Sequence, residues 1–154
     1  MDKYELTNET INHNGTTLYR IKALRDFNDV KKNSLGGFIE KEDNLSHEGN
    51  AWIYDNVRVF GNVEVFGNAK VLGDAWVFDN ALVYGNAEVY GDARVFGDAT
   101  VLDNAKVYGD ARVFGDADVY GNTLVKDVEL NGDRSYNKNI IINPFTKDAK
   151  LGVI

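Results

Sequence analysis

A six-residue repeat runs without an insertion from residue 49 to residue 126, and it constrains the fold of this chain more than any other feature. Thirteen consecutive hexads begin with Gly or Asp, and the second residue is always Asn or Asp. The third residue is Ala in ten hexads, the fifth is Val in twelve, and the sixth is Phe, Tyr or Leu until Lys126. The octapeptide GDARVFGD at 91–98 returns unchanged at 109–116, three hexads later. A fixed short period of this kind predicts a stacked solenoid.

Each hexad is expected to form one short strand and one corner. Alternate side chains of a strand point to opposite faces, so the third and fifth residues share one face and the fourth and sixth share the other. Gly-Asn and Gly-Asp tolerate the unusual backbone angles of a tight corner. Three hexads then close one triangular coil with Ala and Val inside it. Side chains three hexads apart are expected to lie about 4.8 Å apart on successive coils.

The three-hexad period sorts the outward side chains into three faces, and the second face is the most unusual. It carries a line of phenylalanines beside tryptophan and arginine: Phe60, Phe78, Phe96 and Phe114, with Trp76, Arg94 and Arg112. Four phenylalanines in line exceed what a monomer usually exposes to water, and aromatic residues and Arg are enriched at interfaces. We therefore expect this face to contact a second subunit or another partner. Arg94 and Arg112 are candidates for binding an anion.

The hexad pattern resembles the hexapeptide-repeat superfamily of left-handed parallel β-helices. The left-handed sense and a preference for trimers are implied by that resemblance, because spacing alone does not set them. The stretches LYRIKALRDF and LGGFIEKEDNLS, followed by the repeat, look like the YdcK-like hexapeptide proteins of bacteria, phages and prophages. This narrower resemblance implies a bacterial or viral source. It suggests a factor that inhibits a host defence protein or sequesters a small anionic signal.

Both ends of the chain lack the repeat, which divides it into an N-terminal cap (1–48), the β-helix (49–126) and a C-terminal cap (127–154). Asn14-Gly15, between two runs that alternate polar and apolar residues, predicts a β-hairpin. Residues 43–48 form a degenerate hexad that places His47 in the inward slot of valine. Ile140 to Ile142 predict one further strand. Solenoid ends need such caps because they expose unpaired backbone and apolar core.

The composition argues against several kinds of catalysis. Cysteine is absent, so the chain has no disulfide, thiol nucleophile or cysteine metal site. Acyltransferases of the resembling superfamily use a histidine base near a loop that interrupts the coils, and this repeat has no such loop. We expect His13 to be a solvated turn residue and His47 to be a capping residue. Two histidines are too few for a three-histidine zinc site. We predict no enzyme and no cofactor. The alternatives are a degenerate acyltransferase and a purely structural spacer.

Charge and hydropathy limit the expected partners. The formal net charge is −7 and the basic residues form no block, which argues against nucleic acid. No run of about 18 apolar residues occurs and the N-terminal stretch holds no apolar signal core, so we expect a cytoplasmic protein without membrane contact. Asp74, Asp92 and Asp110 form a ladder that is only a weak metal candidate, because hard cations prefer a pocket of oxygens to a line. The expected assembly is a homo-oligomer, with a trimer favoured over a dimer.

Overall fold

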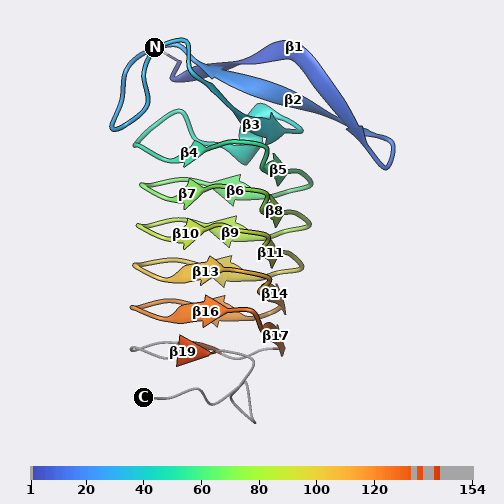
Figure 1. Cartoon of the computed structure of the whole chain (residues 1–154), viewed down its shortest axis with the longest axis vertical. Coiled ribbons are helices and arrows are strands. Elements are labelled where there is room, and N and C mark those ends of the chain that lie inside the picture. The colour runs from blue at the N-terminus through green and yellow to red at the C-terminus, as the bar shows by residue number, and fades with distance from the viewer. Residues whose placement is uncertain (1, 133–134, 137–140, 143–154) are drawn as a thin grey trace.

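The computed structural model describes residues 2–132, 135–136 and 141–142 of the chain. Within these residues the protein is all-β apart from one short 3-10 turn, and its coils stack along a single axis (Figure 1). Strands of successive repeat coils pair in parallel, with partners such as Glu88 and Lys106 lying three hexads apart. The predicted left-handed β-helix is thereby confirmed. No helix in the described part of the chain is long and apolar enough to cross a membrane.

Three sheets form the three faces that the period predicts. The first comprises β4 (Trp52–Ile53), β7 (Lys70–Val71), β10 (Glu88–Val89), β13 (Lys106–Tyr108), β16 (Leu124–Lys126) and β19 (Ile141–Ile142). The second comprises β1 (Tyr4–His13), β2 (Thr16–Ala23), β3 (Leu35–Ile39), β5 (Arg58–Val59), β8 (Trp76–Val77), β11 (Arg94–Val95), β14 (Arg112–Gly115) and β17 (Glu129–Gly132). The third comprises β6 (Glu64–Val65), β9 (Leu82–Val83), β12 (Thr100–Val101), β15 (Asp118–Val119) and β18 (Ser135–Tyr136).

The interior of the coils is filled by the third and fifth residues of the hexads. From Ala51 to Val119 every one of these side chains is fully buried. Burying one valine side chain contributes about 1.5–3 kcal/mol, so this column of Ala and Val supplies most of the favourable burial. The short alanine lets neighbouring walls of the triangle approach one another, which explains why larger residues are rare at that position.

The corners depend on residues with positive φ. Glycines at the first position of the hexad have φ between 63 and 78°, and a Cβ at Gly61 would lie 2.8 Å from the carbonyl oxygen of Asp79. Four aspartates take this position instead, with φ between 55 and 62°: Asp55, Asp79, Asp103 and Asp127. Each of these carboxylates accepts a hydrogen bond from a backbone N–H in the corner of an adjacent coil. The hydrogen bond helps to hold a non-glycine residue in this conformation.

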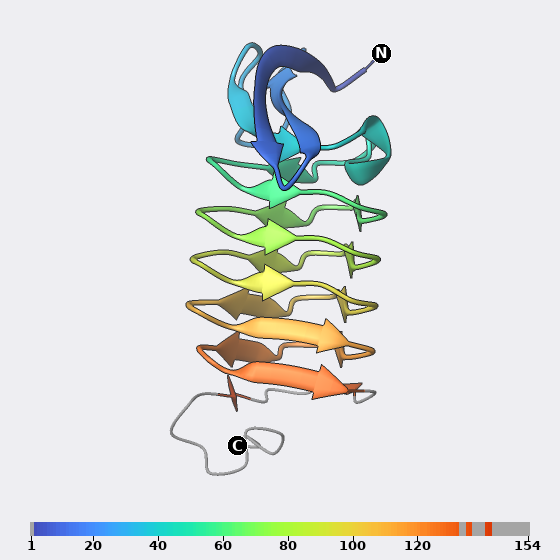
Figure 2. The ribbon, with the colours of Figure 1, turned by 90° about the vertical axis from the view of Figure 1, so that its right-hand side faces the viewer.

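The N-terminal hairpin is present as predicted. β1 and β2 pair antiparallel through Asn14-Gly15, whose φ angles of 49 and 92° fit a two-residue hairpin turn. β3 then pairs antiparallel with β2 and parallel with β5, so the hairpin extends the second sheet across the end of the solenoid (Figure 2).

Residues 24–34 fold over the start of the first face. The ring of Phe27 packs edge-on against Trp52, with 5.2 Å between ring centroids. Trp52 was expected to point outward at the fourth position of its hexad, yet it is only 1% exposed because this segment covers it. The segment is also tied to the first face by Tyr54, whose hydroxyl donates to the Asp29 carboxylate.

The first coil is longer than the others by two positions. Leu45 bridges to Val65, an offset of 20 in the numbering, whereas Trp52 pairs with Lys70 at the usual 18. The N–H of Ser46 donates to the carbonyl of Val65, which agrees with the longer offset. The N–H of Asn50 donates to the carbonyl of Gly67, which agrees with the regular offset. His47 and Glu48 are therefore extra residues in the corner between Ser46 and Gly49. The prediction that His47 occupies the inward valine slot is wrong, because Leu45 occupies it.

The solenoid continues past Lys126 with a coil that is shorter by one position. Arg112 pairs with Glu129 and Leu124 with Ile141, and both offsets are 17 in the numbering. The strand predicted near Ile140–Ile142 is present as β19 (Ile141–Ile142). The rest of the predicted C-terminal cap after residue 132 lies outside the described residues, apart from β18 (Ser135–Tyr136).

Candidate functional site

A cavity of about 420 Å³ lies where the first coil departs from the repeat. It is bounded by the 3-10 turn η1 (Glu42–Asn44), by His47 in the extra corner residues, and by the third face at β6 and β9. Three carboxylates line it, those of Glu42, Asp43 and Glu64. Its apolar lining is Leu45, Val65, Phe66 and Leu82.

Asn44 fixes the turn that carries two of these carboxylates. Its side chain is fully buried, its Oδ1 accepts the N–H groups of Glu40 and Lys41, and its Nδ2 donates to the carbonyls of Gly61 and Val63. All four bonds lie between 3.0 and 3.1 Å. Because a buried amide with every group satisfied is a rigid connection, Glu42 and Asp43 are held against the next coil.

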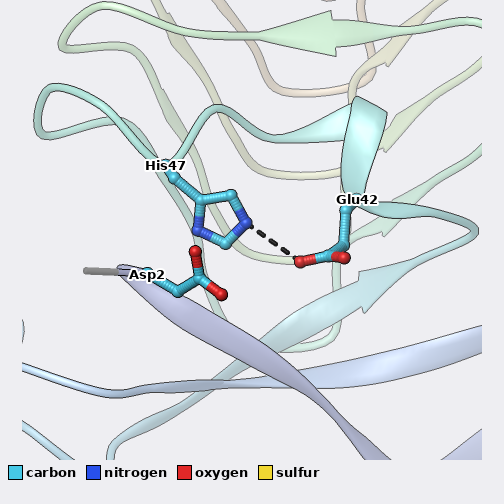
Figure 3. Close-up of side chains that lie close together, drawn as sticks. All are labelled: Asp2, Glu42 and His47. Carbon is cyan, nitrogen blue, oxygen red and sulfur yellow. Dashed lines mark hydrogen bonds and ion pairs between the residues drawn. The ribbon is translucent and has the colours of Figure 1, made fainter.

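His47 is held between Tyr4 and Glu42 at the edge of this cavity. Its ring stacks on that of Tyr4 with 4.1 Å between centroids. Its Nε2 lies 3.0 Å from the Glu42 carboxylate (Figure 3). Its Nδ1 accepts the backbone N–H of Lys3 at 3.1 Å. Tyr4 in turn donates its hydroxyl to the carbonyl of Leu45 at 2.6 Å, and the carbonyl of Glu42 lies 3.0 Å from the same oxygen. Burial, reinforced by Glu42, raises the pKa of Tyr4, so the phenol stays a donor.

The two hydrogen bonds of His47 determine its chemistry. Since Nδ1 accepts from a backbone amide, the neutral ring carries its proton on Nε2, and that N–H donates to Glu42. Neither nitrogen then presents a free lone pair, which a general base requires. The arrangement therefore supports a structural role for His47 more than a catalytic one.

The two hydrogen bonds of His47 also weigh against a metal ion bound by Asp2, Glu42 and His47. Asp2, Glu42 and His47 place one ligand atom each within 4.8 Å of one another, and they are the one such group of three in the described chain. A metal at Nε2 would need that nitrogen deprotonated while Nδ1 still accepts the Lys3 amide, which is not the arrangement of metal-bound histidines. Asp74, Asp92 and Asp110 do not form a comparable cluster among the described residues, as expected for carboxylates spaced along a line.

The second face carries the predicted aromatic ladder. The four phenylalanines that follow β5, β8 and β11 or lie in β14 stack with ring centroids 5.1, 4.8 and 4.7 Å apart and planes within 6° of parallel. All four are half-buried in the single chain. We call Phe60, Phe78, Phe96, Phe114 and Trp76 the phenylalanine face. Stacked rings at this spacing stiffen the ladder, and their outer edges stay open to a partner.

Beside these rings lies a stack of cations and aromatics. Arg94 places its guanidinium 3.8 Å from the ring centroid of Trp76, and Arg58 lies 5.4 Å from it. The Nη1 of Arg94 is buried and has no hydrogen-bond partner among the described residues. Arg112 is exposed one coil further along. The two predicted anion-binding residues are thus neighbours in the same ladder.

His13 completes this stack, and its predicted environment is wrong. It lies beside the hairpin turn as expected, but it is buried against Phe60 and Trp76, with ring centroids 4.4 and 4.6 Å away. Its Nδ1 lies 2.9 Å from a guanidinium nitrogen of Arg58 and accepts from it. Burial first, and then Arg58 and Arg94, lower the pKa of His13, so the ring is held neutral.

The coil length, the corners and the three parallel ladders define the class of this protein. The fold and the repeat are those of the hexapeptide-repeat β-helix superfamily. No family model matches the chain. Within the superfamily it is similar to the uncharacterized acetyltransferase YdcK of Escherichia coli strain K12, with 43% identity over 63 residues. That similarity covers 36% of this chain and 19% of the relative, so the matched stretch spans less than a fifth of the length of that protein.

Proposed function

We propose that this chain is a non-catalytic, homo-oligomeric binding protein whose subunits meet through the phenylalanine face. The observation that carries the proposal is the unbroken, half-buried ladder of four phenylalanines. A repeating face pairs readily with a symmetry-related copy of itself, and burying stacked rings removes apolar area from water. A trimer is favoured by the superfamily resemblance, with a dimer as the alternative.

The proposed ligand or partner of the assembly is a host protein or a small anion, in the cytoplasm of a bacterial cell. Arg94 and Arg112 support the anion, because a buried guanidinium nitrogen without a partner leaves a donor unsatisfied. A phage-type role against a host defence protein has its support in the resemblance of the N-terminal stretches alone.

The subunit contact is tested by changing its apolar face to charge. Phe96→Asp with Phe114→Asp should lower the mass measured by light scattering to that of a single chain. Tyr90→Asp with Tyr108→Asp is the matched control, because these tyrosines stack in the same way on the first face, 4.9 Å apart. An unchanged mass in the phenylalanine variant, with the native β-sheet spectrum, would remove the proposed contact.

A degenerate acyltransferase is the second candidate, and the similarity to the uncharacterized acetyltransferase of E. coli favours it. It predicts that acetyl-coenzyme A binds between coils of neighbouring subunits, which calorimetry measures directly. The occupied ring nitrogens of His47 weigh against it, because the general base of such an enzyme needs a free one.

A further inference from the structure

The cavity beside η1 combines negative charge with an apolar floor. Three carboxylates line it, and no lysine or arginine is among the described residues that do. Glu42 is engaged by His47, whereas Asp43 and Glu64 take part in no ion pair within the described chain. Lys41 lines the neighbouring hollow with both of them, but its ammonium donates to Asn62 at 3.2 Å and pairs with neither carboxylate.

The floor of the cavity offers an aromatic surface. Phe66 is 36% exposed, and Leu35 and Phe66 are the only large apolar side chains exposed to that degree in the described residues. Its ring stacks on Tyr84 with 4.6 Å between centroids, which holds it in place. Leu82 and Val65 continue this surface toward Leu45. A cation over a fixed aromatic ring is attracted to it, and an alkyl stem would cover the partly exposed Leu82.

We propose that this cavity binds an organic cation with an apolar stem, a guanidinium or ammonium group on a short alkyl chain. Its volume of about 420 Å³ is enough for a group of arginine or lysine side-chain size. Glu64 and Asp43 pair with the charge, Phe66 stacks beside it, and Leu82 contacts the stem. This site goes beyond the proposed function, because it lies on the third face and takes a ligand of the opposite charge.

A bare metal ion satisfies these features less well. It would leave the apolar floor unused, and at the group of Asp2, Glu42 and His47 it would have to displace the proton on Nε2 of His47. An organic cation uses both the charge and the floor, and it leaves the bonds of His47 intact.

The test is an NMR titration with butylguanidinium, with the neutral isostere N-butylurea as the comparison. Butylguanidinium should shift the resonances of Glu64, Phe66 and Leu82, and N-butylurea should not. Glu64→Gln should weaken binding roughly tenfold, because it removes a charged hydrogen bond. Phe66→Leu should weaken it about two- to fivefold through the lost cation–π contact. Glu88→Gln, at the same hexad position on the first face, should leave binding unchanged.

A second comparison identifies the source of the cation. N-acetyl-arginine amide binding more tightly than butylguanidinium would indicate an arginine side chain of a protein, and equal binding would indicate a small molecule. Both results support the site, with N-acetyl-citrulline amide as the neutral control.

Several outcomes would overturn the proposal. These are equal shifts with N-butylurea, no shifts at millimolar butylguanidinium, and shifts concentrated on the exposed aspartates of other corners. Competition by Zn²⁺ with shifts at His47 would assign the cluster to a metal instead. None of these outcomes depends on the subunit contact, so a monomeric chain that binds butylguanidinium would separate this inference from the proposed function.

Discussion

The side chain of Lys3 is completely buried at the N-terminal end of the solenoid. Its Nζ donates to the carbonyl of Ala51 at 2.7 Å and more weakly to that of Gly49 at 3.4 Å. The equivalent carbonyls of the next coil, Ala69 and Gly67, accept backbone N–H groups from the coil before it. No regular coil precedes Gly49 at this corner, so the lysine supplies the missing donors.

This burial predicts a pH-dependent stability. Burial first, and then the charge of Arg25, lower the pKa of Lys3 from 10.5 to about 8. Between about pH 8 and 10.5 the unfolded chain binds the proton more tightly than the folded one, so stability rises with pH across this window. Urea unfolding should show the native protein gaining about 1 kcal/mol from pH 8 to pH 9 relative to Lys3→Met.

Lys126→Met, at an exposed lysine, is the control for this measurement and should retain the native pH dependence. Parallel curves for the native protein and Lys3→Met would show that the buried amine does not titrate in this range. The measurement stays below pH 10, because burial raises the pKa of Tyr4 and the stability linked to its neutral form declines above that pH.

Asp79 illustrates how a corner tolerates a residue other than glycine. Its φ is 62°, and its carboxylate accepts the N–H of Gly97 at 3.1 Å. Asp79→Ala keeps the strained backbone and loses the bond, so we expect it to cost about 2 kcal/mol of unfolding free energy. Asp79→Gly loses the bond but relieves the strain, and should stay within about 1 kcal/mol of the native protein.

The exposed Asp116, at the second position of its hexad, provides the comparison for Asp79. Asp116→Ala should change the urea midpoint little, because it removes neither a positive-φ residue nor a bond to the adjacent corner. If Asp79→Gly proved as destabilising as Asp79→Ala, the carboxylate bond would outweigh the backbone strain at this corner.

At the scale of elements, the hexad pattern correctly predicted the features that depend only on the spacing of residues along the chain. The three ladders, the phenylalanine stack and the Asn14-Gly15 turn all follow from residues within one coil or one turn. His47 was misplaced because counting in sixes assumes an unbroken period, and two extra residues in a corner leave no mark in the local pattern. The burial of His13 depends on where the tip of the hairpin meets β5 and β8, which local sequence does not encode.

The candidate site was missed for a related reason. Its carboxylates lie on η1 and β6, and they meet because the first coil departs from the repeat. The sequence did contain one indication, the acidic residues Glu40, Glu42 and Asp43 shortly before Leu45. Only the longer offset of the first coil brings them to Phe66.

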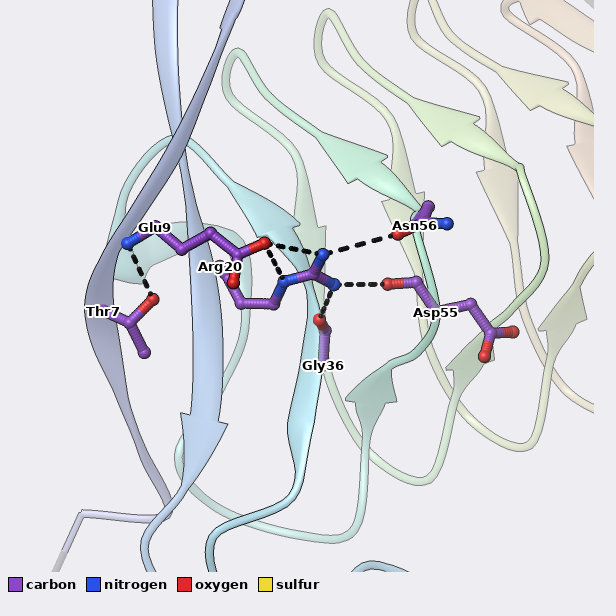
Figure 4. A network of polar contacts seen from close by, with 6 residues as sticks. All are labelled: Thr7, Glu9, Arg20, Gly36, Asp55 and Asn56. Atoms are coloured by element: carbon purple, nitrogen blue, oxygen red, sulfur yellow. Dashed lines mark hydrogen bonds and ion pairs between the residues drawn. The ribbon is translucent and has the colours of Figure 1, made fainter.

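Arg20 links both strands of the hairpin to β3 and to the first regular coil (Figure 4). Its guanidinium donates to the Glu9 carboxylate on β1, to the carbonyl of Gly36 on β3 and to that of Asp55 in the first corner. It also lies 4.2 Å from the ring centroid of Phe38. Gly36, which accepts one of these bonds, packs tightly against the next coil: a Cβ there would lie 2.5 Å from the carbonyl oxygen of Ile53.

Arg20→Met should therefore loosen the hairpin while leaving the coils intact. In hydrogen exchange, backbone amides of β1 and β2 should exchange faster, because the free energy of opening the hairpin falls by about 2 kcal/mol. Exchange in β8 and β11 should be unchanged. Lys22→Met is the matched control on the same strand, where the pair with Glu5 at 3.4 Å is exposed and should contribute less than about 0.5 kcal/mol. Equal effects of the two changes would contradict the central role of Arg20.

At the scale of the whole molecule, each coil contacts only its neighbours, so whole coils are interchangeable units. Deleting residues 91–108 removes one complete coil and leaves every face in register. Deleting residues 91–96 removes one hexad and turns all later coils by one face. Because nearly every hexad contributes the same pair, alanine and valine, to the interior, both shortened chains should fold, with lower melting temperatures than the native protein.

The two deletions differ in what they do to the phenylalanine face. The whole-coil deletion keeps Phe60, Phe78 and Phe114 in one ladder, whereas the single-hexad deletion places Leu102 and Tyr120 below Phe78 and moves Phe114 to the first face. If this face joins the subunits, light scattering should find the oligomer retained in the first variant and lost in the second, at matched β-sheet content. An oligomer of unchanged subunit number in the single-hexad deletion would place the contact on the hairpin or the first coils, which both deletions leave untouched.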